Sequence, residues 1–482
     1  MAPAWSIGLL PVLFSLVGAE AIPQSLANSV VTKDVVILGG GASGSHAAVR
    51  LRDDYGKSVV VVEKEERLGG HVATYIDPVT GRPYDYGVNS YTEYGKAKEF
   101  FARFNVSISV PTRPVLSTKF VDFTTGKELK GYESPAAADV TAALRKYLEI
   151  CEKYENLLIP SYANFPEKDI PEDLLMKFSD FVKKYGLEAM VPRAFQVTGF
   201  AVGNMADELT LYVMQAFGAP ITRTFLGMAD SFTPTSRRNQ ELYDNIADSL
   251  GDDVMYGATV VLSNRDANGV QLLVRNRNSQ FTLIKAKKLL ISFSPTLENL
   301  APFGPDVTEL DVFTKWDPSH AYAGLVTHPS LPNSVSLVNY PASAVPRNWL
   351  ELPKTPFVVR YEWLGDRNFR ILMIGDAFSN SFTAQLMVKS IFKKLLNGVI
   401  STLYTKANME NQELDIIAWA DHSGLHPHLS VEEIKGGFYK KLYALQGRRS
   451  TFYTGRAFTA GFTTILWEYN DQYLLPKLLE SF

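Results

Sequence analysis

The sequence of 482 residues is poor in cysteine, in net charge and in long hydrophobic runs. Cys151 is the only cysteine, so no disulfide can form within the chain, and its place in an expected helix favours a packing role. The net charge is −3, and lysine and arginine are dispersed apart from short clusters such as 285–288. This pattern argues against a nucleic-acid-binding protein and is typical of an ordinary globular chain.

The hydrophobic stretch 5–17 at the N-terminus is too short to cross a bilayer, and no later run reaches that length. It leads into Gly18-Ala19-Glu20-Ala21, a pattern typical of signal-peptide cleavage after Ala21, although no lysine or arginine precedes it. We therefore expect residues 1–21 to be a signal peptide and the mature protein to be secreted or lumenal, without a membrane span. Asn105 begins an N-glycosylation sequon, and it can be glycosylated only if its side chain is exposed.

Three glycines follow the apolar run 35–38, which is typical of a buried parallel strand. The spacing Gly39-x-Gly41-x-x-Gly44 lets the main chain turn tightly and approach a pyrophosphate, and the segment 45–55 then opens a helix. One crossover later, a second apolar run ends at Glu63, whose carboxylate would accept hydrogen bonds from ribose hydroxyls and repel a 2′-phosphate. These features predict a dinucleotide site for FAD or NAD rather than NADP; a plain glycine turn is the alternative.

The residues after Glu63 separate FAD from NAD. The chain passes Gly69-Gly70 and reaches Asp85-Tyr86-Gly87, which resembles the extended fingerprint of the flavin amine oxidase superfamily. The resemblance implies FAD, with the glycine pair bringing main chain against the flavin and its phosphates. His71 stands where the superfamily usually has arginine, and a neutral imidazole is a weaker partner for an anion. Ordinary hydrogen bonding near the cofactor and covalent attachment of the flavin both stay open for His71.

The resemblance implies an α/β fold in which a Rossmann-type FAD-binding domain, glutathione-reductase-like and of the flavin amine oxidase type, is interleaved with an α+β substrate domain. We assign residues 32–110, 236–300 and 436–482 to the FAD-binding domain, and residues 111–235 and 301–435 to the substrate domain. Helical spacing is expected over 136–154, 171–185 and 208–217, and strands over 322–327, 334–340, 357–361 and 369–374. These strands would form the sheet that floors a substrate pocket.

Two later segments resemble the superfamily's returns to the cofactor. Helix 237–250, strand 254–263, a hairpin through 266–269 and a buried strand ending near Pro295 would bring main chain near Val260 against the adenine; an ordinary edge strand is the alternative. A strand ending at Gly455 and a helix opened by 461–467 would bring a helix N-terminus to the isoalloxazine, where it stabilises negative charge on reduction.

The second return departs from the superfamily at Arg456, which stands where an acid is usual, and at Phe462, which stands where a tyrosine often walls an aromatic cage around an amine. We therefore do not transfer amine specificity. Gly375-Asp376 resembles a ribityl-binding pair, but it lies too far from the C-terminus for that role. The candidate cofactor contacts are Gly39, Gly41, Ala42, Ser43, Gly44, Glu63, Lys64, Gly69, Gly70, His71, Val260, Gly455, Phe462 and Thr463.

The segment 421–428 holds three histidines within seven residues, a spacing that metal sites also use. Its glycine, proline and serine predict a loop leading into a helix over 431–445, so we expect no metal. One of these histidines could line the pocket. No catalytic acid or base is forced by the sequence, and Tyr453, His426 and His428 are candidates only by their proximity to the expected flavin region.

Most of the chain, and most specifically the segments 35–64, 437–449 and Leu474-Leu475-Pro476, resembles the β-cyclopiazonate dehydrogenase family of fungal FAD-dependent oxidoreductases. The resemblance implies a secretory enzyme of secondary metabolism that binds a small-molecule substrate. Hydride would leave a bulky apolar intermediate, of the prenylated indole tetramic acid or diterpenoid pyrone type, in a dehydrogenation or oxidative cyclisation. The electron acceptor, O2 or another, and the oligomeric state stay open.

Two other functional classes are compatible with the same motifs. One is a flavin amine oxidase that acts on a small amine. The other is a non-catalytic binding protein of the GDI-like type, whose members tolerate a degraded nucleotide site. The intact set of Gly39, Gly41, Gly44 and Glu63 favours an oxidoreductase.

Overall fold

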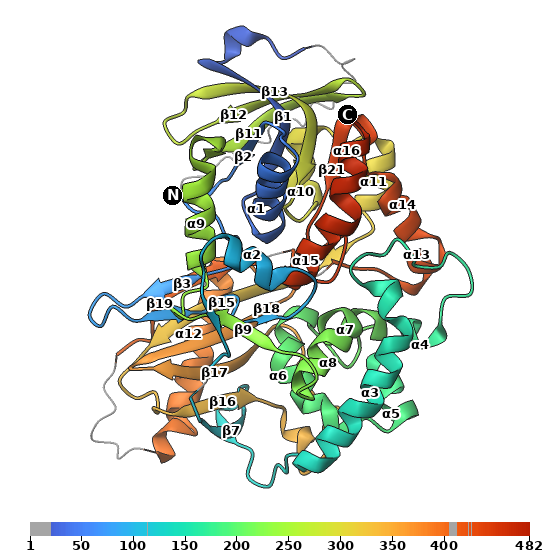
Figure 1. Cartoon of the computed structure of the whole chain (residues 1–482). Coiled ribbons are helices and arrows are strands. Elements are labelled where there is room, and N and C mark those ends of the chain that lie inside the picture. The colour runs from blue at the N-terminus through green and yellow to red at the C-terminus, as the bar shows by residue number, and fades with distance from the viewer. Residues whose placement is uncertain (1–20, 113, 404–411, 423, 426) are drawn as a thin grey trace, which may run out of the picture.

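The structure, a computed structural model, describes residues 21–112, 114–403, 412–422, 424–425 and 427–482. The expected signal peptide, apart from Ala21, and the candidate His426 lie outside these residues. Two seven-stranded sheets organise the described chain, one in the upper part of the molecule in Figure 1 and one in the lower part. The first sheet is built around the valine-rich runs 35–38 and 59–62, which are buried on both faces as parallel strands require.

The first sheet has the order β10-β2-β1-β13-β12-β11, and a further strand, β21, pairs in parallel with the end of β13. The hairpin predicted through 266–269 is confirmed, with Asp266 opposite Gly269. The carboxyl ends of β1, β2, β13 and β21 meet at one edge, which faces the second sheet. The strands are β1 Ser29–Leu38, β2 Val59–Val62, β10 Val254–Met255, β11 Thr259–Asp266, β12 Gly269–Arg275, β13 Phe281–Ile291 and β21 Thr451–Tyr453.

Helices cover the first sheet and join it to the C-terminus (Figure 1). The first begins at Ala42, three residues before the predicted start. The predicted helix 431–445 is wrong as a single element, because Gly436-Gly437 breaks it and Gly437 has a φ of 77°. The helices are α1 Ala42–Val49 continued by η2 Arg50–Asp54, α2 Ala97–Arg103, α9 Gln240–Leu250, α10 Leu297–Leu300, α11 Val307–Phe313, α13 Val431–Lys435, α14 Phe438–Ala444, and α15 Thr463–Tyr469 continued by η10 Asn470–Leu474 and α16 Leu475–Glu480.

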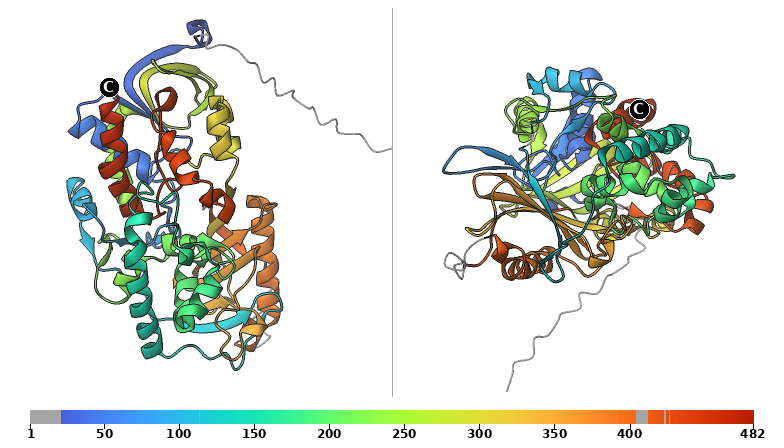
Figure 2. Two further views of the ribbon diagram at one scale, coloured as in Figure 1. Left: turned by 90° about the vertical axis from the view of Figure 1, so that its right-hand side faces the viewer. Right: turned by 90° about the horizontal axis from the view of Figure 1, so that it is seen from below.

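The second sheet has the order β19-β15-β18-β17-β16-β7-β8, and the four strands predicted between 322 and 374 all belong to it. Its strands are β7 Ser117–Asp122, β8 Lys127–Glu128, β15 His320–Thr327, β16 Val335–Asn339, β17 Phe357–Gly365, β18 Asn368–Gly375 and β19 Asp415–Asp421. The helices α3 Ala137–Leu158, α4 Glu172–Leu175, α5 Phe178–Tyr185, α6 Val191–Val202, α7 Thr210–Ala216 and α8 Ala219–Phe225 form a layer beside this sheet, as Figures 1 and 2 show, and α12 Ser381–Asn397 covers its other face.

Short strands connect these parts: β3 Thr74–Ile76 with β4 Pro83–Asp85, β9 Ser231–Pro234 with β5 Tyr91–Thr92 and β6 Ile108–Ser109, and β14 Asp317–Pro318 with β20 Pro427–His428. One large buried core runs between the sheets and the helical layer, and a second lies under α12. Cys151 packs in α3, where burial raises the pKa of its thiol.

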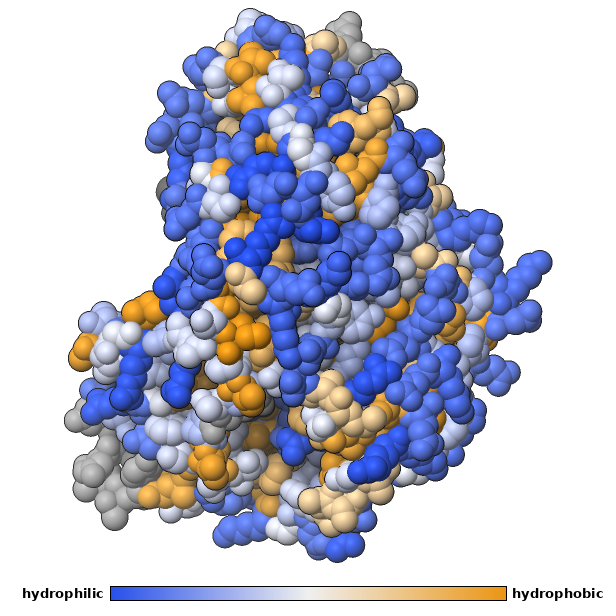
Figure 3. All heavy atoms as spheres, viewed as in Figure 1, coloured by the Kyte–Doolittle hydropathy of each residue, from blue (hydrophilic) through white to orange (hydrophobic). Residues whose placement is uncertain are grey.

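The domain boundaries stay predictions, with one adjustment suggested by packing. Helix α11, which we assigned to the substrate domain, contacts the first sheet through Glu309, so that boundary would lie nearer residue 314. On the face shown in Figure 3, hydrophilic residues predominate and apolar residues form small scattered groups. Among the described residues, no helix is both long and apolar enough to span a membrane.

Candidate functional site

The chain turns sharply where β1 meets α1. Gly39 has a φ of 94°, which residues with a side chain rarely adopt. A β-carbon on Gly44 would collide with the carbonyl oxygen of Gly39, so the helix can approach the strand this closely only with glycine there. The N-cap, Gly41, supplies no side-chain hydrogen bond to the first turn of α1. The first-turn N–H groups therefore keep their donors for an external acceptor such as a phosphate oxygen.

Glu63 follows β2 at the same edge of the sheet, and it is only 6% exposed. Its two carboxylate oxygens accept hydrogen bonds from the backbone N–H groups of Gly40, at 2.6 Å, and Glu65, at 2.8 Å. The carboxylate is thereby fixed beside the glycine turn. It keeps lone pairs for further donors, which is what recognition of a ribose requires.

The glycine pair lies directly against the first turn. Gly69 donates its N–H to the carbonyl oxygen of Gly40 at 2.9 Å, and Gly70 has a φ of 56°. A β-carbon on Gly70 would lie 2.9 Å from the α-carbon of Gly41, so the two backbones form a cradle that a side chain would fill. Together with Glu63 and the N-terminus of α1, this cradle fits the pyrophosphate and ribose of FAD.

The C-terminal segment returns to the same edge. Gly455 has a φ of 99°, and its Cα lies beside Ser292 at the end of β13; the Ser292 hydroxyl donates to the Leu38 and Gly39 carbonyl oxygens. In the final helical segment, the fully buried Asn470 donates to the Ser43 carbonyl oxygen at 2.9 Å and accepts from Thr454 at 2.6 Å. The structure thus brings Gly455 together with the glycine turn, and α15, with Phe462 as its N-cap and Thr463 first, is held against α1.

Two further candidate cofactor contacts, Val260 and Lys64, stay predictions. The segment hydrogen-bonded to Glu63 comprises Met255 and Ala258, which precede Val260 at the start of β11, so the contact of Val260 with adenine stays a prediction. The side chain of Lys64 is 74% exposed and pairs with Glu65.

His71 and two histidines of the segment 421–428 lie near one another. The rings of His71 and His422 are 4.3 Å apart. Burial, together with the positive charge of Arg456, lowers the pKa of His422 to about 4 and that of His428 to about 3. His71 is exposed at the cradle, and the pKa of its imidazole is lowered by partial removal from water and by the nearby His422 and Arg456. All three imidazoles are therefore neutral near pH 7.

His428 also contacts an acid that sequence reasoning missed. Its Nδ1 lies 3.4 Å from a carboxylate oxygen of Glu208, and its ring lies 4.8 Å from that of Tyr212. Burial raises the pKa of Glu208 to about 7, with smaller contributions from Asp317 and Asp207. Glu208 is therefore an acid–base group that can change its charge near neutral pH. No sequence motif marks it.

Comparison with known proteins identifies the group to which this site belongs. Residues 37–104 match the NAD(P)-binding Rossmann-like domain family. The chain is 33% identical to the FAD-dependent oxidoreductase pigF of Monascus ruber, over 94% of this chain and 93% of that protein. It is 31% identical to β-cyclopiazonate dehydrogenase of Aspergillus oryzae, with 93% of each chain covered. It is 34% identical to the FAD-dependent oxidoreductase oblC of Cochliobolus heterostrophus, over 94% and 92% of the two chains.

The chain belongs to this family of fungal FAD-dependent oxidoreductases. FAD is its cofactor, as the sequence predicted, and the resemblance to the β-cyclopiazonate dehydrogenase family is confirmed. Among solved structures, a CLA-producing fatty acid isomerase from P. acnes aligns with a TM-score of 0.70 at 18% identity, over 92% of this chain and 98% of that one. Putrescine oxidase aligns at 0.59 and 14%, over 94% and 98%. These similarities confirm the predicted fold class.

The structure argues against a catalytic role for Tyr453 in this oxidoreductase. Its hydroxyl donates to Glu309 at 2.7 Å, and Glu309 forms an ion pair with Arg265 at 2.9 Å, both carboxylate and guanidinium being about 1% exposed. Burial raises the pKa of the phenol well above its ordinary value. The side chain of Tyr453 thus points into the protein interior, where Tyr453, Glu309 and Arg265 form a buried clamp that joins β21, α11 and β11.

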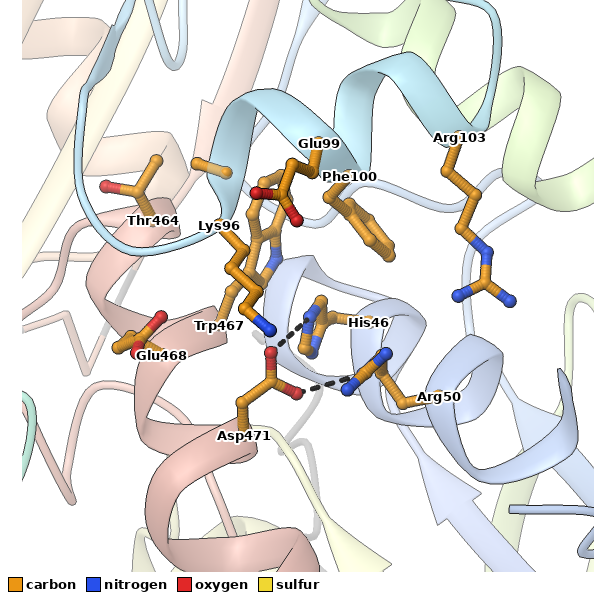
Figure 4. Close-up of a pocket in the computed structure, with 11 residues that line it drawn as sticks. His46, Arg50, Lys96, Glu99, Phe100, Arg103, Thr464, Trp467, Glu468 and Asp471 are labelled. Carbon is orange, nitrogen blue, oxygen red and sulfur yellow. Dashed lines mark hydrogen bonds and ion pairs between the residues drawn. The ribbon is translucent and has the colours of Figure 1, made fainter. Parts of the chain in front are cut away.

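A pocket of about 220 Å3 lies between α1, α2 and α15, and Figure 4 shows the residues that line it. His46 lies at its centre, stacked on Trp467, with Asp471 paired to both His46 and Arg50. None of the candidate cofactor contacts lines this pocket. The positive and negative side chains that line this pocket largely neutralise one another. We therefore interpret it as a contact between helices that holds the C-terminal helical segment on α1, and not as the cofactor site of the oxidoreductase.

The structure locates the predicted glycosylation site but does not test whether it is used. Asn105 is exposed, as glycosylation would require. Among the described residues, no group of three or more His, Cys, Asp or Glu side chains could hold a metal ion. The residues that sequence reasoning missed include Tyr162, Glu208, Tyr212 and Tyr439. The abundance of tyrosine was visible, but the sequence does not show which tyrosines converge.

Proposed function

We propose that this oxidoreductase acts in fungal secondary metabolism and oxidises a bulky apolar natural-product intermediate by dehydrogenation or oxidative cyclisation. The observation that carries the proposal is the complete FAD cradle of Gly41, Glu63 and Gly70, in a chain that aligns over nearly its whole length with β-cyclopiazonate dehydrogenase. We expect the substrate to be of the prenylated indole tetramic acid or diterpenoid pyrone type. Bound FAD supplies the two-electron oxidation.

The protein would bind and orient the substrate with side chains on the second-sheet side of the cradle. Near His428 the core is rich in aromatic rings: those of Tyr162 and Tyr439 lie 4.5 Å apart, as do those of Phe165 and Tyr439. Tyr212 accepts a hydrogen bond from the N–H of Leu429, at 2.7 Å, and so is held beside His428. These rings are buried and pack against one another, so they would form the water-excluding layer behind the substrate rather than its contact surface. Glu208 and His428 are candidates for moving a proton in the same region.

A small cationic amine fits this site less well. Arg456, in the loop between β21 and α15, has no acidic partner among the described residues, and an ammonium group near it would be repelled. Phe462 replaces the tyrosine of an aromatic cage. The likeness to putrescine oxidase is one of fold and carries no substrate.

The experiment is to delete the coding gene in the source organism and to compare metabolite extracts. We expect an apolar precursor to accumulate. The purified protein, loaded with FAD, should convert that precursor to a product two hydrogens lighter and bleach the flavin absorbance when oxygen is absent. A protein that leaves every accumulated compound unchanged, yet is bleached by putrescine, would refute the proposal in favour of an amine oxidase.

A further inference from the structure

Arg456 is a half-buried cation without an ionic partner among the described residues. Its Nε is buried and makes no hydrogen bond, and its guanidinium forms no ion pair with any described residue. Burial lowers the pKa of the guanidinium to about 10. Most buried charges in proteins are paired, because an isolated charge is costly to remove from water. An arginine kept in this state is therefore a candidate for pairing with a ligand.

The described neighbours of Arg456 supply no compensating negative charge. Its positive charge lowers the pKa values of His71, His422 and His428, which are neutral near pH 7. Burial raises the pKa of Tyr162 well above its ordinary value, so this phenol is also neutral. The nearby acid Glu208 contacts His428, and Arg456 is absent from the groups that shift the pKa of Glu208.

The position of Arg456 joins the cofactor cradle to the second sheet. It directly follows Gly455, and a β-carbon on Gly461 would collide with its guanidinium, so the side chain lies across the entrance to α15. His71 follows Gly70 of the cradle, and its ring lies 4.3 Å from that of His422, which follows β19. A cation at this junction is placed to hold a ligand group that reaches from the flavin side toward the second sheet.

We propose that Arg456 binds an acidic group of the substrate, a carboxylate or an ionised enol, with His71 and His422 as neutral hydrogen-bonding neighbours. This inference rests on the proposed function, because it takes the ligand of Arg456 to be the substrate of the enzyme. Arginine suits the role because its planar donors match two oxygens of such an anion. The substrate class is thus a bulky apolar molecule with one anionic oxygen group, which Arg456 would use to fix its orientation.

The test measures binding of benzoate and of its neutral counterpart benzamide to the FAD-loaded protein by calorimetry. We compare the wild-type protein with Arg456→Gln, Arg456→Lys and Arg347→Gln; Arg347 is an exposed arginine paired with Glu133 and serves as the control. In Arg456→Gln the Kd for benzoate should rise roughly tenfold or more, since a hydrogen bond to a charged group is lost. Arg456→Lys should recover part of the affinity, and Arg347→Gln should match the wild type. Benzamide should not distinguish the variants.

Equal benzoate affinity in the wild type and Arg456→Gln would overturn the proposal, as would a wild-type protein that binds benzoate no better than benzamide. The reduced flavin is a second possible partner of Arg456, because it carries negative charge. Measuring the midpoint potential of the flavin distinguishes this partner from an acidic group of the substrate. A lowered potential in Arg456→Gln with unchanged benzoate affinity would assign Arg456 to the flavin and refute the substrate site. FAD content and thermal unfolding of each variant check that it is folded and loaded. Because benzoate replaces the natural substrate, failure of this site is distinguishable from failure of the metabolite experiment.

Discussion

Gly70 and Gly56 have similar backbone conformations, with φ values of 56° and 62°, but only Gly70 lacks room for a side chain. Gly70→Ala should lower the affinity for FAD by tenfold or more, because its β-carbon would press against Gly41 in the cradle. Gly56→Ala should lose only the roughly 1 kcal/mol expected for a left-handed alanine. Titration of the apoprotein with FAD, followed by fluorescence, measures both. Equal FAD affinity in the two variants would contradict the assignment of the cradle.

Glu208 predicts a pH dependence of stability. Because burial raises its pKa from the ordinary value to about 7, the folded state holds a proton that the unfolded state has already lost between about pH 4.5 and 7. The contribution of Glu208 to the free energy of unfolding is therefore largest at low pH and falls as pH rises through that window. Glu208→Gln should gain stability relative to the wild type across it, by up to about 3 kcal/mol.

Urea unfolding at a series of pH values measures this difference. The neutral histidines make stability rise with pH over part of the same range, and the contributions of His71 and His422 cancel in the comparison. His428 contacts Glu208, so the measured difference reports this pair together. Glu149→Gln, at an exposed position of α3, is the control and should show no such trend. A difference between Glu208→Gln and the wild type that does not change with pH would contradict the raised pKa of Glu208.

At the scale of elements, a buried ion pair joins β11, α11 and β21. Arg265 pairs with Glu309 and donates to the Phe303 carbonyl oxygen, and Tyr453 donates to the same carboxylate. Arg265→Met leaves Glu309 with a weaker set of partners and should cost about 3–5 kcal/mol of stability. Tyr453→Phe should cost only about 1–2 kcal/mol and leave kcat unchanged.

Thermal unfolding and steady-state kinetics check these two variants, with the exposed Arg347→Gln as control. A large loss of kcat in Tyr453→Phe, without loss of stability, would restore Tyr453 as a catalytic residue. The sequence suggested Tyr453 because it ends a strand near the flavin. It could not show that the side chain points into the clamp, because Glu309 lies 144 positions away in the chain.

The elements that depend on local sequence were predictable. The glycine turn, the acid after β2 and the hairpin at 266–269 each have a short-range signal, and the structure has all three. The helix 431–445 was predicted as one element, since apolar spacing continues across Gly436-Gly437. The grouping of His71, His422 and Arg456 was not predictable, because it depends on how the two sheets pack.

At the scale of the whole molecule, we propose that the protein enters the secretory pathway and carries a glycan at Asn105. Expression with the complete N-terminus in a fungal host should place the protein in the medium or lumen, with Ile22 as its first residue. Treatment with an N-glycosidase should increase its mobility on a gel, and Asn105→Gln should abolish that shift. An intracellular protein that keeps Met1 would contradict the proposal.

FAD bound in the cradle of Gly41, Glu63 and Gly70 is the central feature of this protein. The most direct measurement is an absorption spectrum of the purified protein, followed by acid precipitation. We predict the two peaks of oxidised flavin and free FAD in the supernatant, at one FAD per chain. Colour that stays in the precipitate would show covalent attachment and point to His71. A colourless protein that cannot be loaded with FAD would contradict the assignment of this chain as a flavin-dependent oxidoreductase.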